Sequence, residues 1–405
     1  MISSILIELS RVCKFTLYQP IQLYRKFTAE QIFNGYDFLP ADSVLITDHK
    51  GIIMDIMPIA SAGEDIQVLN GLLSPGFINS HCHLELSHMR GLIPKNTGLV
   101  DFVLQIIAKR NASHESIQET IAYAENEMRK NGIVAVGDIC NTDHTISQKL
   151  HNNLYYHNFI ETSGFPEGVA DHRFEQAKLL YDQFTSILNH NSIVPHAPYS
   201  VSSTLLKKIL DFQGIEVLSM HSQETMDEDQ LYQNKSGDLL QLYEKLNIDI
   251  RSFTPSGKNS LRTFIPYFNS LQQLILVHNV TTSEDDLAIV NQHYKDHRAN
   301  LFFCLCPNAN QYISGMLPDV QMLVNNDCNL VLGTDSLASN DQLNILSEIR
   351  TIQSAFPSIS FSQILKWATM NGARALHISD QFGSFEKGKK PGVLNISGDE
   401  IRVLI

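Results

Sequence analysis

The chain has 405 residues, with 30 basic and 43 acidic side chains and a formal net charge of −13. Lysine and arginine form no dense run, which excludes a basic surface of the kind that neutralises nucleic-acid phosphates. The six cysteines contain no CxxC pair, and no stretch approaches the roughly 20 apolar residues of a membrane span. We therefore expect a cytoplasmic protein that binds a small molecule, with neither nucleic acid nor a membrane as partner. A homo-oligomer is compatible with the sequence.

The sequence predicts short strands near both ends of the chain. Residues 1–25 show no clear hydrophobic periodicity, and we assign no helix or strand to this N-terminal extension. Within 26–72, apolar runs such as Ser43–Thr47 and Ile52–Ile56 alternate with turn residues, and 385–405 is again strand-like. We predict that the two ends contribute to one small sheet.

Between the ends, over 73–384, eight apolar β-rich runs alternate with helical patterns, which predicts a parallel sheet covered on both faces. The runs are Leu73–Ser80, Ile133–Ile139, Leu154–Ile160, Ser192–Val194, Ile215–Met220, Gln273–Val277, Leu301–Leu305 and Leu330–Leu332. A doubly wound open sheet usually carries a Gly-rich phosphate turn after its first strand, whereas here that strand ends in histidines. The count of eight favours a closed (β/α)8 barrel, whose site lies where the C-terminal ends of the strands meet.

Polar residues recur at these strand ends. His81 and His83 end the first strand and project to the same face, because alternate residues of a strand do so. Alone, such a pair is most simply a polar strand end. The fifth strand ends in His221, the sixth in His278, and the eighth is followed by Asp335. A barrel brings these ends together, so three imidazoles and a carboxylate become available to one catalytic divalent metal, a set suited to Zn²⁺ and compatible with Fe²⁺.

This arrangement offers a way to activate water. Metal coordination lowers the pKa of water from about 15.7 to about 7, so hydroxide exists at neutral pH. Glu224, three residues beyond His221, can reach the same space and deliver protons to a leaving group, and His278 can orient the water or stabilise charge. The plainer alternatives are capped strand ends for the ligands, a helix-start carboxylate for Glu224 and a satisfied core histidine for His278.

Five segments, in this order, resemble the amidohydrolase superfamily: PGFINSHCH, PHAPYSVS, MHSQET, LVHNV and LGTDS. They are most similar to its aminohydrolase branch, which includes adenosine-type, S-adenosylhomocysteine, guanine and aminodeoxyfutalosine deaminases and the triazine hydrolases. The resemblance covers about Leu45 to the C-terminus. It implies a distorted (β/α)8 TIM barrel over 73–384 with a small β-sandwich formed by the two chain ends, 26–72 and 385–405.

The same resemblance implies roles for individual residues. One metal would be held by His81, His83, His221 and Asp335, with Glu224 as proton shuttle, His278 beside the metal-bound water and Asp335 receiving a proton from it. Binuclear members carry a bridging carboxylated lysine on the fourth strand, and this chain has none there, which favours a single metal.

The resemblance also points to substrate contacts. His196, after the fourth predicted strand, would touch substrate, with a core histidine as the alternative. Glu85 is either a substrate contact, a partner of a ligand or a member of a structural salt bridge. Its H-x-E spacing also fits half of another zinc-deaminase signature, but the required Pro-Cys dipeptide does not occur in the chain. Asn310 and Ser336 are further candidates for substrate contact, although Ala309 stands where the family usually has serine.

The expected function is a metal-dependent hydrolytic deaminase that releases ammonia from an amino-substituted N-heterocycle or a nucleoside-like compound. The HLELS text that begins at His83 favours an aminodeoxyfutalosine-deaminase-like enzyme. A related amidohydrolase that expels chloride or an alkylamine from a similar ring is the first alternative. A non-catalytic barrel scaffold is the second, and the presence of every expected ligand and of Glu224 argues against it.

Overall fold

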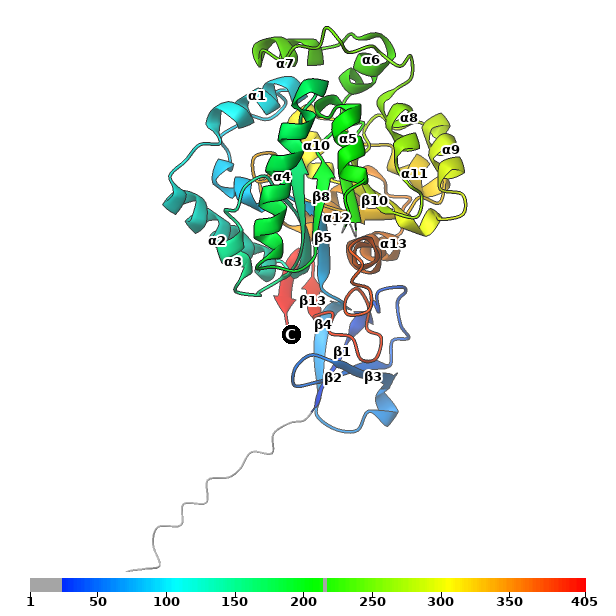
Figure 1. Ribbon diagram of the computed structural model, residues 1–405. Coiled ribbons are helices and arrows are strands. Elements are labelled where there is room, and N and C mark those ends of the chain that lie inside the picture. Colours follow the sequence, from blue (N-terminus) through cyan, green and yellow to red (C-terminus); the bar gives the residue numbers. More distant parts are fainter. Residues whose placement is uncertain (1–23, 214–216) are drawn as a thin grey trace, which may run out of the picture.

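The computed structural model describes residues 24–213 and 217–405. Residues 1–23 of the expected N-terminal extension, and the first two residues of the predicted fifth strand, lie outside this part. Figure 1 shows a helix-covered barrel with a smaller sheet below it, and both chain ends lead into that sheet. None of the helices in the described part is long and apolar enough to cross a membrane.

Eight parallel strands form the barrel. They are β5 (Phe77–Cys82), β6 (Ile133–Cys140), β7 (Tyr155–Thr162), β8 (Asn191–Pro195), β9 (Val217–Ser222), β10 (Gln273–His278), β11 (Leu301–Leu305) and β12 (Leu330–Leu332). They pair in chain order as two four-stranded halves. At one seam the N–H of His221 donates to the carbonyl of His196 (2.9 Å), and at the other the N–H of Asp335 donates to the carbonyl of His81 (3.1 Å). The predicted closed (β/α)8 barrel is confirmed.

The barrel strands are buried and mostly apolar because both of their faces are covered. All six residues of β10 are buried, and Leu274 pairs with Leu218 on one side and Leu301 on the other. Parallel strands that are covered on both faces have nearly continuous apolar sequences, without the alternation of apolar and polar residues seen in half-buried strands. Some buried polar side chains lie inside the strands, such as His157 and Asn158 of β7, whereas the histidines of the site lie at the strand ends.

Helices alternate with the strands around the barrel, in agreement with the predicted pattern. They include α2 (His114–Lys130), α4 (Ala170–Thr185), α5 (Ser203–Leu210), α9 (Glu284–His293), α12 (Ile345–Ala355) and α13 (Phe361–Lys366). Ser283 caps the start of α9, since its hydroxyl accepts the N–H of Asp286. The helical segment Phe361–Leu376 is not one regular α-helix. Its first part, α13, continues through a π-helical turn (Trp367–Asn371) into α14 (Gly372–Ala375).

Further helices lie in the connections: α1 (Leu99–Lys109), α3 (Ile146–Lys149), α6 (Met226–Asn234), α7 (Leu239–Lys245), α8 (Ser260–Phe264), α10 (Pro307–Ser314) and α11 (Val320–Asn325). Among them α1 packs against α7 at the end of the barrel opposite the small sheet (Figure 1). The two helices thereby cover the rim at which the C-terminal ends of the strands meet.

The small sheet is built from both ends of the chain, as predicted. Its strands are β1 (Tyr24–Ile32), β2 (Ser43–Asp48), β3 (Ile53–Pro58), β4 (Ile66–Ser74), β13 (Leu394–Ser397) and β14 (Glu400–Val403), in the order β14-β13-β4-β1-β2-β3. β13 joins antiparallel to β4, with Leu394 opposite Ser74. The sheet has its own buried cluster, which includes Phe27, Leu45 and Val393.

Candidate metal centre and substrate cavity

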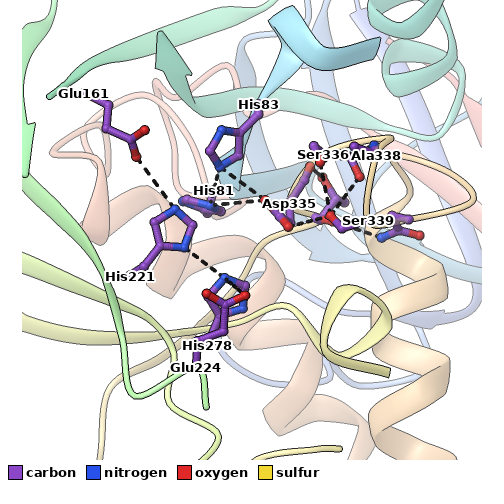
Figure 2. Close-up of polar contacts among 12 residues, drawn as sticks. His81, His83, Glu161, His221, Glu224, His278, Asp335, Ser336, Ala338 and Ser339 are labelled. Carbon is purple, nitrogen blue, oxygen red and sulfur yellow. Dashed lines mark hydrogen bonds and ion pairs between the residues drawn. The ribbon is translucent and has the colours of Figure 1, made fainter. Parts of the chain in front are cut away.

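The first two predicted ligands lie at the end of β5. His81 is fully buried and His83 nearly so, and their Nε2 atoms lie 3.1 Å apart. Asp335, which follows β12, brings its Oδ1 to 3.6 Å from His81 Nε2 and 3.2 Å from His83 Nε2 (Figure 2). This approach requires Gly333, because a Cβ at that position would lie 2.8 Å from the Cβ of His81.

His221, on β9, completes the group from the other half of the barrel. Its ring centroid lies 4.8 Å from that of His81 and 5.6 Å from that of His83. One ring nitrogen from each of the three histidines falls within 4.8 Å of the others. The structure therefore brings all four predicted ligands to one point on the rim.

The chemistry of these groups fits a divalent metal. Burial, reinforced by the charge of His81, lowers the pKa of His83 to about 3, and burial lowers the pKa of His221 well below its usual value. Both imidazoles are therefore neutral at pH 7 and can offer a lone pair. Burial alone would raise the pKa of Asp335, but the hydrogen bond with His81 and the charge of His83 lower it well below its usual range. His221 Nε2 is buried without a hydrogen-bond partner in the described part, as expected for an atom whose partner is a cation.

A polar network holds the Asp335 carboxylate in place. Ser339 donates its hydroxyl to Asp335 Oδ2 over 2.5 Å, and its own oxygen lies 3.1 Å from the Ser336 hydroxyl. The N–H of Thr334 donates to Asn79 Oδ1 over 3.0 Å. Hydrogen bonds of this kind fix the orientation of a ligating carboxylate.

Non-glycine residues with left-handed backbone conformations cluster at this rim. They are Gln223 (φ 49°), His278 (φ 78°), Asn279 (φ 58°) and Asp335 (φ 56°). Such residues are uncommon, and the strain persists where the surrounding structure imposes it, typically at functional sites. Each lies within three residues of the C-terminal end of a barrel strand.

Glu224 and His278 form a second pair beside the ligands. Glu224 Oε1 lies 3.6 Å from His278 Nε2, and the same nitrogen lies 3.0 Å from His221 Nδ1 (Figure 2). Burial, together with the negative charge of Asp335, raises the pKa of Glu224 to about 8. Glu224 therefore carries a proton at pH 7. Asn310 lies behind this pair, with its Nδ2 3.1 Å from His278 Nδ1.

A cavity of about 490 Å³ opens above the centre. Its floor presents His83, His196, His221, Glu224 and Asp335. Its roof is apolar and comes mainly from α1 and α7, with Phe102, Val103, Ile106, Leu242 and Leu246. One wall is polar and contains Glu85, Arg110, Asn141 and Glu161. The cavity thus joins a polar floor to an apolar cover.

The predicted substrate contacts divide between the cavity and its support. His196, Glu85 and Ser336 line the cavity, and their assignment as substrate contacts stays a prediction. Asn310 is not among the lining residues and instead contacts His278. The sequence reasoning missed Glu161, whose Oε1 lies 3.7 Å from His221 Nε2. The sequence feature that could have identified Glu161 is its position directly after the predicted strand Leu154–Ile160.

The model of the amidohydrolase family matches residues 72–394 of this chain. The chain belongs to the amidohydrolase family. The resemblance drawn from the five sequence segments is therefore confirmed. The family and the histidine cluster together support a divalent metal at this centre.

This amidohydrolase is 26% identical to an adenosine deaminase of Helicobacter pylori over 333 residues, which are 79% of this chain and 78% of that protein. Its fold is similar to that of H. pylori aminofutalosine deaminase in complex with methylthio-coformycin, with a TM-score of 0.77, 22% identity and 92% of both chains covered. It is also similar to an adenosine deaminase from Xanthomonas campestris with bound zinc, with a TM-score of 0.68, 22% identity and 91% and 83% of the two chains covered.

Proposed function

We propose that this amidohydrolase is a metal-dependent hydrolytic deaminase of an amino-substituted N-heterocycle within a nucleoside-like compound. The observation that carries the proposal is the protonated Glu224, with a pKa of about 8, placed beside a centre of neutral imidazoles and an ionised Asp335 at the floor of a cavity. Titratable groups whose environments separate their pKa values in this way are typical of an acid and a base acting together. The adenosine and aminofutalosine deaminases among its relatives support the same reaction class.

His81, His83, His221 and Asp335 would hold the metal, and a set of three imidazoles and one carboxylate favours Zn²⁺. When bound, the metal supplies a lowered pKa for water at the centre. The X. campestris relative, which has bound zinc, supports this choice of metal.

The remaining work falls to the side chains of this chain. Asp335, ionised at pH 7, receives a proton as water adds to the amidine-like carbon. Glu224 donates its proton to the ring nitrogen bonded to that carbon, which keeps the adduct neutral. His278, held between Glu224, His221 and Asn310, orients the water and stabilises charge at the reacting carbon. A second proton then passes to the amino group, the C–N bond breaks, ammonia leaves and a carbonyl remains.

The proposal is tested by measuring bound metal in the purified protein and screening for ammonia release. The panel consists of adenosine, 5′-methylthioadenosine, aminodeoxyfutalosine, guanine, an aminopyrimidine and a chlorotriazine, the last also assayed for chloride. We expect metal close to stoichiometric and ammonia from at least one nucleoside. Chloride release alone would favour the triazine-hydrolase alternative, and no ammonia from metal-replete protein across the panel would contradict the proposal.

The metal centre has a separate test. A double variant, His83→Ala with Asp335→Ala, should lose the metal, because it removes two of four ligands. Near-stoichiometric metal in that variant would place the metal elsewhere.

A further inference from the structure

Two buried carboxylates and an amide form the polar side of the cavity, which we call the carboxylate wall: Glu85, Asn141 and Glu161. Glu85 lies on the 3₁₀-helix Leu84–Met89 that follows β5, Asn141 follows β6, and Glu161 lies near the end of β7. Asn141 joins the other two, since its N–H donates to Glu85 Oε2 over 3.1 Å and its Nδ2 donates to Glu161 Oε2 over 3.2 Å. The wall is therefore fixed on three neighbouring elements of the barrel.

Each carboxylate has one oxygen that is hydrogen-bonded and one that is not. Glu85 Oε2 also accepts the N–H and the hydroxyl of Thr142, at 2.9 and 2.7 Å. Glu85 Oε1 and Glu161 Oε1 are buried and have no hydrogen-bond partner among the described residues. Arg110 Nη2 and His221 Nε2 each lie 3.7 Å from one of these oxygens, beyond hydrogen-bond range. Native proteins rarely leave a buried acceptor without a donor, so the donor is expected from a ligand.

We infer that these two free oxygens accept hydrogen bonds from hydroxyl groups of the substrate, and that Glu161 is a specificity-determining residue. The inference rests on the proposed function, because a nucleoside-like substrate carries vicinal hydroxyls on its sugar. A carboxyl oxygen without a donor accepts a hydrogen bond, so the wall favours ligand groups that donate one, such as hydroxyls. A site built to bind hydroxyls strongly rejects an analogue that lacks them, since its buried polar groups are then left unpaired.

The surroundings of Glu161 also allow a different role, in which its carboxylate is a ligand of a cation. Glu161, His196 and His221 offer ligand atoms within 4.8 Å of one another. Glu85 favours the hydroxyl-binding role. Its Oε1 also lacks a hydrogen-bond partner, and the group that lies near this oxygen is the Arg110 guanidinium, which is not a metal ligand. His196 already has its Nδ1 2.7 Å from the Ser200 hydroxyl. A cation reading predicts that removal of the Glu161 charge lowers the metal content, which the experiment measures.

The test compares adenosine with 2′,3′-dideoxyadenosine as substrates of the metal-loaded, full-length protein. We measure kcat/KM from ammonia release for the wild type, for Glu161→Gln and for Glu85→Gln. Glutamine keeps the shape of glutamate, and thermal unfolding checks that each variant folds. Glu167→Gln is the matched control, because Glu167 is exposed and lies outside this cavity.

The wild type should prefer adenosine by about 10- to 100-fold, the range for a hydrogen bond to a charged group. Glu161→Gln and Glu85→Gln should each bring this preference toward unity at full metal content, whereas Glu167→Gln should keep it. A Glu161→Gln variant that keeps the preference while slowing both substrates equally would overturn the inference. Loss of metal in Glu161→Gln would also overturn it and favour the cation reading.

A failure of the proposed function is distinguishable from a failure of this inference. If the wild type releases no ammonia from either probe, calorimetry of the two probes still decides. Equal affinity of the wild type for both would overturn the inference. Tighter binding of adenosine that Glu161→Gln abolishes would support the wall as a hydroxyl-binding surface in a protein with another reaction.

Discussion

The buried ion pair behind His83 offers the sharpest test of how the barrel supports the centre. Lys149 is 2% exposed, and its Nζ lies 2.5 Å from Asp138 Oδ2 and donates to Asn158 Oδ1 over 2.7 Å. The other carboxylate oxygen, Asp138 Oδ1, accepts the N–H of Leu84, the residue after His83, over 2.8 Å. Burial alone would lower the pKa of Lys149, but Asp138 raises it above the usual value, so Lys149 keeps its charge.

Replacing Lys149 by methionine would leave Asp138 buried without its counter-charge. Breaking a buried pair in this way destabilises a protein by about 3–5 kcal/mol, whereas exposed pairs contribute little. Lys149→Met should therefore lower the urea midpoint of the metal-loaded protein strongly. It should also weaken metal binding by about 10- to 100-fold, the usual effect of disturbing a group that orients a ligand.

Two further variants serve as controls for the role of the buried Lys149–Asp138 pair. Lys178→Met removes one partner of the exposed Lys178–Asp182 pair (2.6 Å) and should leave the urea midpoint unchanged. The double variant Lys149→Met with Asp138→Asn removes both buried charges and should recover much of the lost stability. A Lys149→Met midpoint equal to that of Lys178→Met would refute the importance of the buried pair.

Four other predictions concern the reaction. Glu224→Gln should lower kcat by about 10²- to 10⁴-fold, the usual contribution of a general acid or base, and a near-normal rate of ammonia release would remove its role. Because its raised pKa of about 8 keeps Glu224 protonated below that pH, wild-type activity should fall as the pH rises through about 8, a limb that Glu224→Gln should lack. Chelation should abolish activity and lower the thermal midpoint, since a ligand of the native state stabilises it, and Zn²⁺ should restore both; chelated protein with full activity would contradict the metal centre. Phe102→Ala, in the roof, should raise KM for 5′-methylthioadenosine several-fold more than for adenosine, and equal changes would place the roof away from the substituent.

The strand ends were predictable because barrel geometry converts sequence position into spatial position. Once eight parallel strands are expected, a residue directly after a strand must lie at one rim, and this places His81, His221 and Asp335 together without further information. Neither helix packing nor loop conformation changes the rim at which these residues lie. That is why the candidate ligands could be predicted although the exact strand limits could not.

The roof and the carboxylate wall depend on information that local patterns lack. Which connecting helices fold over the rim, here α1 and α7, is decided by packing between segments more than a hundred residues apart. Glu161 was missed because a single carboxylate at a strand end looks the same in sequence whether solvent or a cavity surrounds it. The π-helical turn at Trp367–Asn371 was missed because one extra residue in a turn leaves the apolar spacing almost unchanged.

The short link between the small sheet and the barrel ties the assembly of the centre to both ends of the chain. β4 ends at Ser74 and β5 begins at Phe77, so only Pro75 and Gly76 separate them. The N–H of Gly76 donates to the carbonyl of Pro391 over 3.0 Å, which anchors the link to the C-terminal segment. A shift of one residue here would turn His81 of β5 to the opposite face of the strand and displace His83, which follows the strand. The C-terminal segment therefore helps to hold the register of the first metal-binding strand, so a change near Pro391 reaches the centre through the backbone.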